Sequence, residues 1–253
     1  MREANKTFAG KVAVVTGAAS GMGAATAREF AASEGEVIIV DRNRPLAEQV
    51  ASDINSGPPV IGDVSDASFC KRAVETALER HGRLDVLVNA AGIIVRADAL
   101  NTSDEQWQRI MDVNVKGVFF MSRAAVPHMK ILGRGAIVNF GSIWGTVGAT
   151  GAVAYCASKG AVHQITRAMA LDHVRDGIRI NAVCPGEVNT PMLASERTEP
   201  VTAELMERLA ATVPLGRLAD PLEIARVVLF LASDSASYIT GSLLTVDAGY
   251  TAR

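Results

Sequence analysis

Short runs rich in valine and isoleucine alternate with longer helical patterns along the whole chain. Runs of this length suit strands that are buried on both faces, and the segments between them are long enough for helices. Such alternation predicts a doubly wound parallel α/β sheet. We expect strands at 11–16, 37–40, 60–62, 84–89, 136–140, 178–183 and 243–246, and helices at 22–33, 44–54, 67–81, 102–130, 153–176, 203–211 and 221–233.

The chain length of 253 residues, without a linker, repeat or low-complexity tract, favours one domain over 1–253. This domain is expected to be of the Rossmann type, with seven parallel strands and helices on both faces. The pattern at 102–130 is long enough for two successive helices. An irregular stretch and a short helix at 186–212 interrupt the compact pattern, and we interpret them as a substrate lid.

Composition excludes several classes of function. The net charge of −2 gives no broad attraction to nucleic acid or to an anionic membrane. The three cysteines lack metal-binding spacing, so we expect no metal. The N-terminus lacks the apolar core of a signal peptide, and no apolar stretch reaches the ~18–20 residues of a membrane span. We therefore expect a cytoplasmic protein that acts on a small molecule.

A glycine-rich turn follows the first predicted strand and opens the first predicted helix. Glycines there permit close backbone approach to a pyrophosphate, whose charge meets the helix N-terminus. The spacing is Gly-x-x-x-Gly-x-Gly rather than the common Gly-x-Gly-x-x-Gly, and a glycine turn without a ligand is the alternative. The residues expected to contact a dinucleotide are Gly17, Ser20, Gly21, Met22 and Gly23.

Polar residues end the next predicted strands. A carboxylate at Asp41 can accept hydrogen bonds from ribose hydroxyls and would repel a 2′-phosphate, which favours NAD over NADP. Asp63 and Val64 could meet adenine, although Asp63 or Ser65 could instead cap the following helix. In the run 89–92, small residues up to Gly92 would let a flat cofactor lie close.

Tyr155 and Lys159 are four residues apart in a predicted helix and so share a face. At roughly 5 Å and an effective dielectric of about 20, the ammonium would favour the phenolate by up to about 3 kcal/mol. Burial opposes this effect. By itself, the spacing most often places a half-buried aromatic ring beside a solvated lysine.

Taken together, these motifs resemble the short-chain dehydrogenase/reductase family, of the NAD-preferring Tyr-x-x-x-Lys type, over essentially the whole chain. The elements that carry the resemblance are Thr-Gly-x-x-x-Gly-x-Gly at 16–23, Asp63, Asn-Ala-Ala-Gly at 89–92, Asn114, Ser142, Tyr155-x-x-x-Lys159, Pro185-Gly186, and tail motifs at 214–217, 221–224 and 238–241.

The resemblance implies an enzyme with a catalytic set and a bound NAD. Ser142 would orient the reacting oxygen, Tyr155 would be the general acid or base, and Lys159 would bind the nicotinamide ribose. Asn114 would interrupt a helix and hold a water in a proton relay. The remaining residues expected at the cofactor are Asn89, Tyr155, Pro185, Val188 and Thr190. The family also implies a homotetramer.

The residues expected to contact substrate, besides Ser142, are Arg96, Trp144, Val153 and Glu187. Arg96 could bind an anionic tail or be a solvated loop charge, and Glu187 could bind a polyol or cap local backbone. This mixture favours oxidation of a secondary alcohol in a polyol, a sugar-like compound or a hydroxy acid. The alternatives are a 3-oxoacyl carrier-protein reductase and a non-catalytic cofactor-sensing protein.

Overall fold

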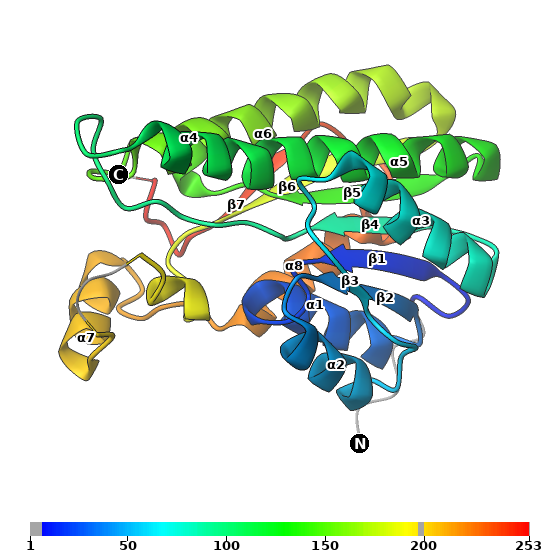
Figure 1. Cartoon of the computed structure of the whole chain (residues 1–253), viewed down its shortest axis with the longest axis horizontal. Coiled ribbons are helices and arrows are strands. Elements are labelled where there is room, and N and C mark those ends of the chain that lie inside the picture. The colour runs from blue at the N-terminus through cyan, green and yellow to red at the C-terminus, as the bar shows by residue number, and fades with distance from the viewer. Residues whose placement is uncertain (1–6, 197–199, 253) are drawn as a thin grey trace.

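The computed structural model describes residues 7–196 and 200–252 and contains one seven-stranded sheet (Figure 1). The strand order is β3-β2-β1-β4-β5-β6-β7, and every neighbouring pair is parallel, which confirms the predicted doubly wound sheet. The strands are β1 (Val12–Thr16), β2 (Glu36–Asp41), β3 (Val60–Ile61), β4 (Val86–Asn89), β5 (Gly135–Phe140), β6 (Ile178–Pro185) and β7 (Leu243–Val246).

Helices cover both faces of the sheet, as predicted. In Figure 1, α1, α2 and α8 lie below the strands, and α4, α5 and α6 lie above them. The helices are α1 (Gly21–Ala32), α2 (Arg44–Asp53), α3 (Ala67–His81), α4 (Asp104–Met111), α5 (Gly117–Leu132), α6 (Val153–His173), α7 (Ala203–Thr212) and α8 (Pro221–Ala232). Among the described residues, no helix is long and apolar enough to cross a membrane.

Two predicted helices are subdivided in the structure. The pattern at 102–130 consists of α4 and α5, joined by a π-helical turn at Asp112–Lys116. The pattern at 153–176 ends in a 3₁₀ turn at Val174–Asp176. The other boundaries differ from the predicted ones by at most two residues, as is usual at the ends of elements.

Alternation along β1 shows how the sheet separates two hydrophobic cores. Ala13 and Val15 pack with α1, α2 and α8, whereas Val12 and Val14 pack with α3 and α5. Successive side chains of a strand point to opposite faces, so both faces of β1 are buried by helices. The carboxyl ends of the strands are thereby fixed between two helical layers.

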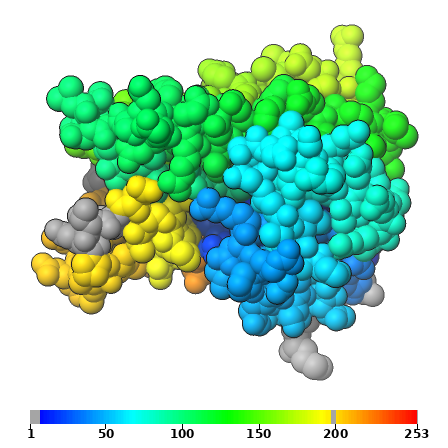
Figure 2. Space-filling view, viewed as in Figure 1, coloured from blue at the N-terminus to red at the C-terminus, as the bar shows by residue number. Residues whose placement is uncertain are grey.

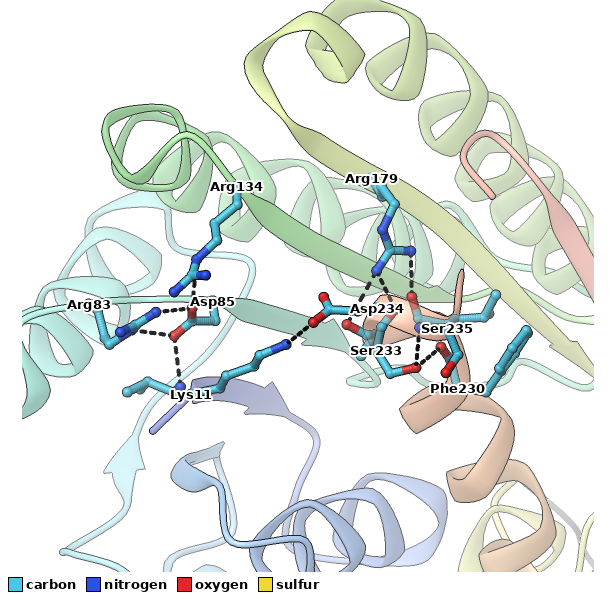
Figure 3. Close-up of polar contacts among 12 residues, drawn as sticks. Lys11, Arg83, Asp85, Arg134, Arg179, Phe230, Ser233, Asp234 and Ser235 are labelled. Carbon is cyan, nitrogen blue, oxygen red and sulfur yellow. Dashed lines mark hydrogen bonds and ion pairs between the residues drawn. The ribbon is translucent and has the colours of Figure 1, made fainter. Parts of the chain in front are cut away.

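At the amino ends of the strands, buried charges anchor the chain (Figure 3). The Asp85 carboxylate accepts the Val12 N–H at 3.0 Å and both ends of the Arg83 guanidinium at 2.7 and 2.6 Å. On β6, Arg179 donates to the carbonyls of Leu231 and Ser233, at the C-terminus of α8. Both contacts lie at the sheet edge opposite the predicted site.

We expect Asp85→Ala to lower the free energy of unfolding by about 3 kcal/mol, because it removes the acceptor of a buried N–H and the partner of a guanidinium. Asp234→Ala is the matched control. Its carboxylate pairs with Lys11 at 3.1 Å but is 92% exposed, so the loss should be at most about 1 kcal/mol. Urea unfolding of the two variants measures both values, and equal losses would contradict this account.

Candidate active site

A cavity of about 330 Å³ opens at the carboxyl ends of the first strands. Figure 2 shows the surface hollowed where the yellow segment after β6 meets the blue N-terminal elements and the green α4 region. Ligands of open parallel sheets bind at this edge. The predicted cofactor residues that line the cavity are Gly17, Ser20, Gly21, Met22, Gly23, Asp41, Asp63, Val64, Gly92 and Thr190.

The glycine turn is shaped by close backbone packing. Gly17 has φ +65°, and a Cβ there would lie 2.7 Å from the backbone of Ala91. A Cβ at Gly23 would collide with the carbonyl of Gly17. The Thr16 hydroxyl accepts the N–H groups of Ala90 and Ala91, at 3.1 and 3.2 Å, and so ties the turn to the end of β4.

This turn leads directly into α1, whose first three residues line the cavity. The N–H groups of a helix's first turn have no partner within the helix and attract an anion. Backbone close enough for direct contact and a helix N-terminus together suit a pyrophosphate group. The turn therefore fits a dinucleotide cofactor.

Asp41 is held in place by the backbone on both sides. One carboxylate oxygen accepts the Ala19 N–H at 3.0 Å, and the other accepts the Asn43 N–H at 2.9 Å. The negative charge is thus fixed at the cavity wall, next to the glycine turn. A fixed carboxylate suits ribose hydroxyls and disfavours a phosphate.

Asp63 also lines the cavity, and its carboxylate accepts the Ser65 N–H at 2.8 Å. The alternative that Asp63 or Ser65 caps the next helix is wrong, because Asp66 is the N-cap of α3 and accepts the Ser68 N–H.

Apolar residues of this cavity that the sequence analysis missed include Leu46, Ile93 and Val113. No motif marks them.

A second, smaller cavity of about 70 Å³ lies beside the first, and Met22, Ile94, Thr190 and Met192 border both. This cavity brings together residues that were predicted to catalyse the reaction, to bind the nicotinamide or to contact the substrate. They are Arg96, Ser142, Trp144, Tyr155, Pro185, Glu187 and Val188. A dinucleotide in the first cavity would therefore extend toward Tyr155.

Tyr155 and Lys159 share the buried face of α6. The Lys159 Nζ lies 5.6 Å from the centre of the Tyr155 ring and donates to the Phe140 carbonyl at 2.7 Å. Ser142, after β5, accepts the Trp144 N–H at 3.1 Å through its hydroxyl. The Trp144 ring stands edge-on to the Tyr155 ring, with 6.0 Å between the centres.

Burial controls the protonation of this pair. It raises the pKa of Tyr155 to about 12, against a smaller lowering by the hydrogen bond with Ser142. It also lowers the pKa of Lys159 to about 8. The rise agrees with the expectation that burial opposes the phenolate. A lowering of the tyrosine pKa by Lys159 together with the oxidised nicotinamide stays a prediction. At neutral pH these groups hold Tyr155 as the phenol.

Asn114 lies in the π-helical turn between α4 and α5, as expected of a residue that interrupts a helix. Its side chain accepts the Ile93 N–H at 2.8 Å and donates to the Ile93 carbonyl at 2.9 Å. It also donates to the Ser158 hydroxyl at 3.0 Å. Asn114 therefore joins the loop after β4 to α6, next to the tyrosine.

Asn89 and Val153 lie outside the two cavities, which corrects both assignments. Asn89 is 2% exposed, and its amide donates to Ser122 at 3.1 Å and to Asn139 at 2.9 Å, in the interior between β4 and its neighbours. Val153 opens α6 and is 40% exposed. Two residues correspond to about 200° around a helix, so it points away from Tyr155.

Lys159 lies beneath the floor of the site rather than on a cavity wall. Its Nζ is 3.7 Å from the position that a Cβ at Gly92 would take. Because Gly92 lines the larger cavity and has no side chain, the ammonium lies next to that cavity at this position. Within residues 7–196 and 200–252, no cluster of three His, Cys, Asp or Glu side chains could hold a metal ion.

The start of the predicted lid is attached to the rim of the site. Arg96 donates its Nε to the Ser195 carbonyl at 3.1 Å, and Arg109 pairs with Glu196 at 3.6 Å. The segment continues into α7, while 197–199 lie outside the described residues. The contact of Arg96 with the lid backbone is a role that the sequence analysis did not anticipate.

Comparison with known proteins gives matches over almost the whole chain. A family model described as enoyl-(acyl carrier protein) reductase matches residues 17–251. The chain is 43% identical to meso-2,3-butanediol dehydrogenase of Serratia marcescens, over 97% of this chain and 96% of that protein. It is 44% identical to galactitol 2-dehydrogenase (L-tagatose-forming) of Cereibacter sphaeroides, over 96% of this chain and 95% of that protein.

A solved structure shares the fold. It is the 3-ketoacyl-(acyl-carrier-protein) reductase of Brucella melitensis complexed with NADH, which superposes with a TM-score of 0.89. The two sequences are 37% identical, and the match covers 96% of this chain and 99% of the other.

Proposed function

The chain belongs to the short-chain dehydrogenase/reductase family, and from that premise we propose that it is an NAD-dependent enzyme that interconverts a secondary alcohol and a ketone. The observation that carries the proposal is the continuity of the glycine-lined cavity with the pocket of Ser142 and Tyr155. The two curated relatives are named for oxidation of a diol and of a polyol. We therefore propose a small polar alcohol as the substrate.

The residues that would hold NAD follow from the fit of the site. The first turn of α1 would receive the pyrophosphate, and Asp41 would accept the adenosine-ribose hydroxyls. Lys159 would hold the nicotinamide ribose, with Val188 and Thr190 beside the nicotinamide. When bound, NAD supplies the acceptor for the hydride, and side chains of the protein accept or donate the proton.

Three side chains carry out the remaining chemistry. Ser142 would hydrogen-bond the substrate oxygen and so orient the carbon that gives up hydride. In oxidation, the phenolate form of Tyr155 takes the hydroxyl proton and becomes the phenol, and in reduction the phenol gives this proton to the carbonyl oxygen. Asn114 would hold a water between the loop after β4 and α6, as a path for that proton.

A second candidate activity is reduction of a 3-oxoacyl carrier-protein thioester, because the structural relative is a 3-ketoacyl-(acyl-carrier-protein) reductase bound to NADH. The family model that matches is also named for an acyl carrier protein enzyme. Both candidate enzymes need the same tyrosine and serine. They differ in the substrate that the smaller cavity and the segment after β6 admit.

One assay distinguishes the candidates. The purified protein is offered NAD with diols, polyols, sugars, hydroxy acids and hydroxysulfonates, and NADH with an acetoacetyl thioester. We expect NADH formation with members of the diol and polyol set, faster at about pH 9 than at about pH 6 because Tyr155 must lose its proton. Turnover of the thioester alone would favour the reductase, and cofactor binding without any turnover would favour a sensing protein.

We expect Asp41→Asn to lower the ratio of kcat/KM with NAD to that with NADP by about 10- to 100-fold, since it removes the charge that repels a 2′-phosphate. Asp63→Asn is the matched control, because it removes a carboxylate from the same cavity away from the expected ribose. It should change both cofactors equally. Steady-state kinetics with each cofactor measures the ratio, and an unchanged ratio in Asp41→Asn would reject the assignment.

For the assembly, we propose a cytoplasmic homotetramer, as the family resemblance implies. Exposed apolar side chains on α5 and α6 support contact between subunits, among them Phe119, Ile131 and Leu171, the last two 85% and 79% exposed. Light scattering coupled to size exclusion measures the mass, and a monomer would contradict the proposal.

A further inference from the structure

The buried face of α6 carries one more polar residue beyond the catalytic pair. His163 follows Lys159 by four residues, as Lys159 follows Tyr155, so the three lie on the same side of the helix. The imidazole is 3% exposed and lies beneath the loop after β5 that carries Ser142. None of the proposed catalytic steps uses this residue.

The loop is packed directly on the imidazole ring. A Cβ added at Gly141 would lie 2.6 Å from Nε2 of His163, and one added at Gly145 would lie 2.6 Å from its Cε1. The two residues that flank the Ser142 turn are thus glycines where any side chain would strike the ring. The ring therefore fixes the distance of the loop from α6 on the Gly141 side, and it shares this role with the Lys159 backbone at Gly145.

Hydrogen bonding indicates which nitrogen of the His163 ring carries the proton. The Ser142 N–H points to Nε2 at 3.5 Å, and the Cys184 Sγ lies 3.3 Å from the same nitrogen. A backbone N–H can only donate, so we assign Nε2 as the acceptor and the proton to Nδ1. Burial, followed by the positive charges of Lys159 and Arg167, lowers the pKa of His163 to about 4, which keeps the imidazole neutral.

We propose that His163 is a positioning residue that fixes Ser142 relative to Tyr155. Tyr155 is carried by α6 itself, whereas Ser142 belongs to a loop after β5 that contacts α6 through the imidazole and, at Gly145, through the Lys159 backbone. The neutral ring supplies both a surface for the flanking glycines and an acceptor for the serine N–H. This inference rests on the proposed dehydrogenase function, in which Ser142 orients the reacting oxygen.

The kinetic test compares His163→Ala, His163→Gln and, as a matched control, His173→Ala at the far end of α6. Glutamine can place an acceptor near the position of Nε2, whereas alanine leaves neither surface nor acceptor. We expect kcat to fall by about 10- to 100-fold in His163→Ala, with NADH affinity within about two-fold of wild type. Glutamine should restore at least part of kcat, and His173→Ala should keep all of it.

A second readout needs no turnover and so separates this inference from the proposed function. Trp144 lies in the same turn, and the chain has two tryptophans, so Trp107→Phe leaves Trp144 as the reporter. We expect acrylamide to quench its fluorescence more strongly in His163→Ala than in His163→Gln or the control. Unchanged quenching together with unchanged kcat in His163→Ala would overturn the proposal.

The wild-type protein provides a third arm that does not depend on any variant folding. NMR of protein labelled at the histidine nitrogens should show the Nδ1–H tautomer of His163, with Nε2 as the acceptor. An Nε2–H tautomer would overturn the proposal, because that nitrogen could not then accept the Ser142 N–H.

Discussion

Tyr155→Phe should lower kcat for alcohol oxidation by about 10³- to 10⁴-fold, the upper range for loss of a general acid–base group. The substitution removes one hydroxyl and leaves the ring, which can keep its edge-on contact with Trp144. The cofactor cavity is lined by other residues, so NADH affinity should stay within about two-fold. Stopped-flow hydride transfer and NADH fluorescence titration measure the two quantities separately.

Tyr238→Phe is the control for this substitution, because its side chain is fully exposed and far along the chain from the site. It should retain the wild-type rate. If Tyr155→Phe kept more than about a tenth of the wild-type kcat, the acid–base role would have to belong to another group. If the wild-type protein itself bound NADH but turned over no substrate, the sensing alternative would be preferred.

Gly17→Ala should weaken NADH binding by at least about 100-fold. The added Cβ would lie 2.7 Å from the Ala91 backbone, and neither backbone segment can yield without moving the turn away from the end of β4. The pyrophosphate contacts depend on that position, because they are made by backbone N–H groups. Isothermal titration with NADH measures the loss, and far-UV circular dichroism checks that the sheet and helices form.

Gly82→Ala separates the steric effect from the cost of the backbone angle. Gly82 ends α3 with φ +72°, close to the +65° of Gly17, but among the described residues a Cβ there would meet nothing within 4 Å. Both variants therefore carry a left-handed alanine, at about 1 kcal/mol each. Only Gly17→Ala should lose NADH affinity. An equal loss of NADH affinity in the two variants would show that close packing at Gly17 is not the cause.

Local patterns predicted the sheet and the common face of Tyr155 and Lys159, because both depend on residues that are close together in the sequence. Seven apolar runs separated by helical stretches have few arrangements other than a doubly wound sheet. Tyr155 and Lys159 lie on one helix, so their common face follows from four residues of separation. The glycine turn was equally local, since Gly17 and Gly23 flank the start of a single helix.

The features that the sequence missed depend on contacts between distant segments. Asp41 and Asn89 both end strands, yet one lines the cavity and the other bonds to Ser122 and Asn139 inside the fold. The interruption of the helix at Asn114 was expected, but its contact with Ile93, twenty-one residues earlier in the chain, was not. The pKa of Tyr155 is raised mainly by burial of its ring, and sequence spacing does not show how deeply a side chain is buried.

The double anchoring of Asp41 has a consequence for redesign of coenzyme preference. Its two oxygens hold Ala19 within the glycine turn and Asn43 at the start of α2, so the group that would select the coenzyme also braces the loop that would receive its pyrophosphate. Substitution of Asp41 alone would change the preference between NAD and NADP but would also lower kcat/KM with both coenzymes. A productive redesign would first give those two backbone N–H groups other acceptors, and only then remove the charge.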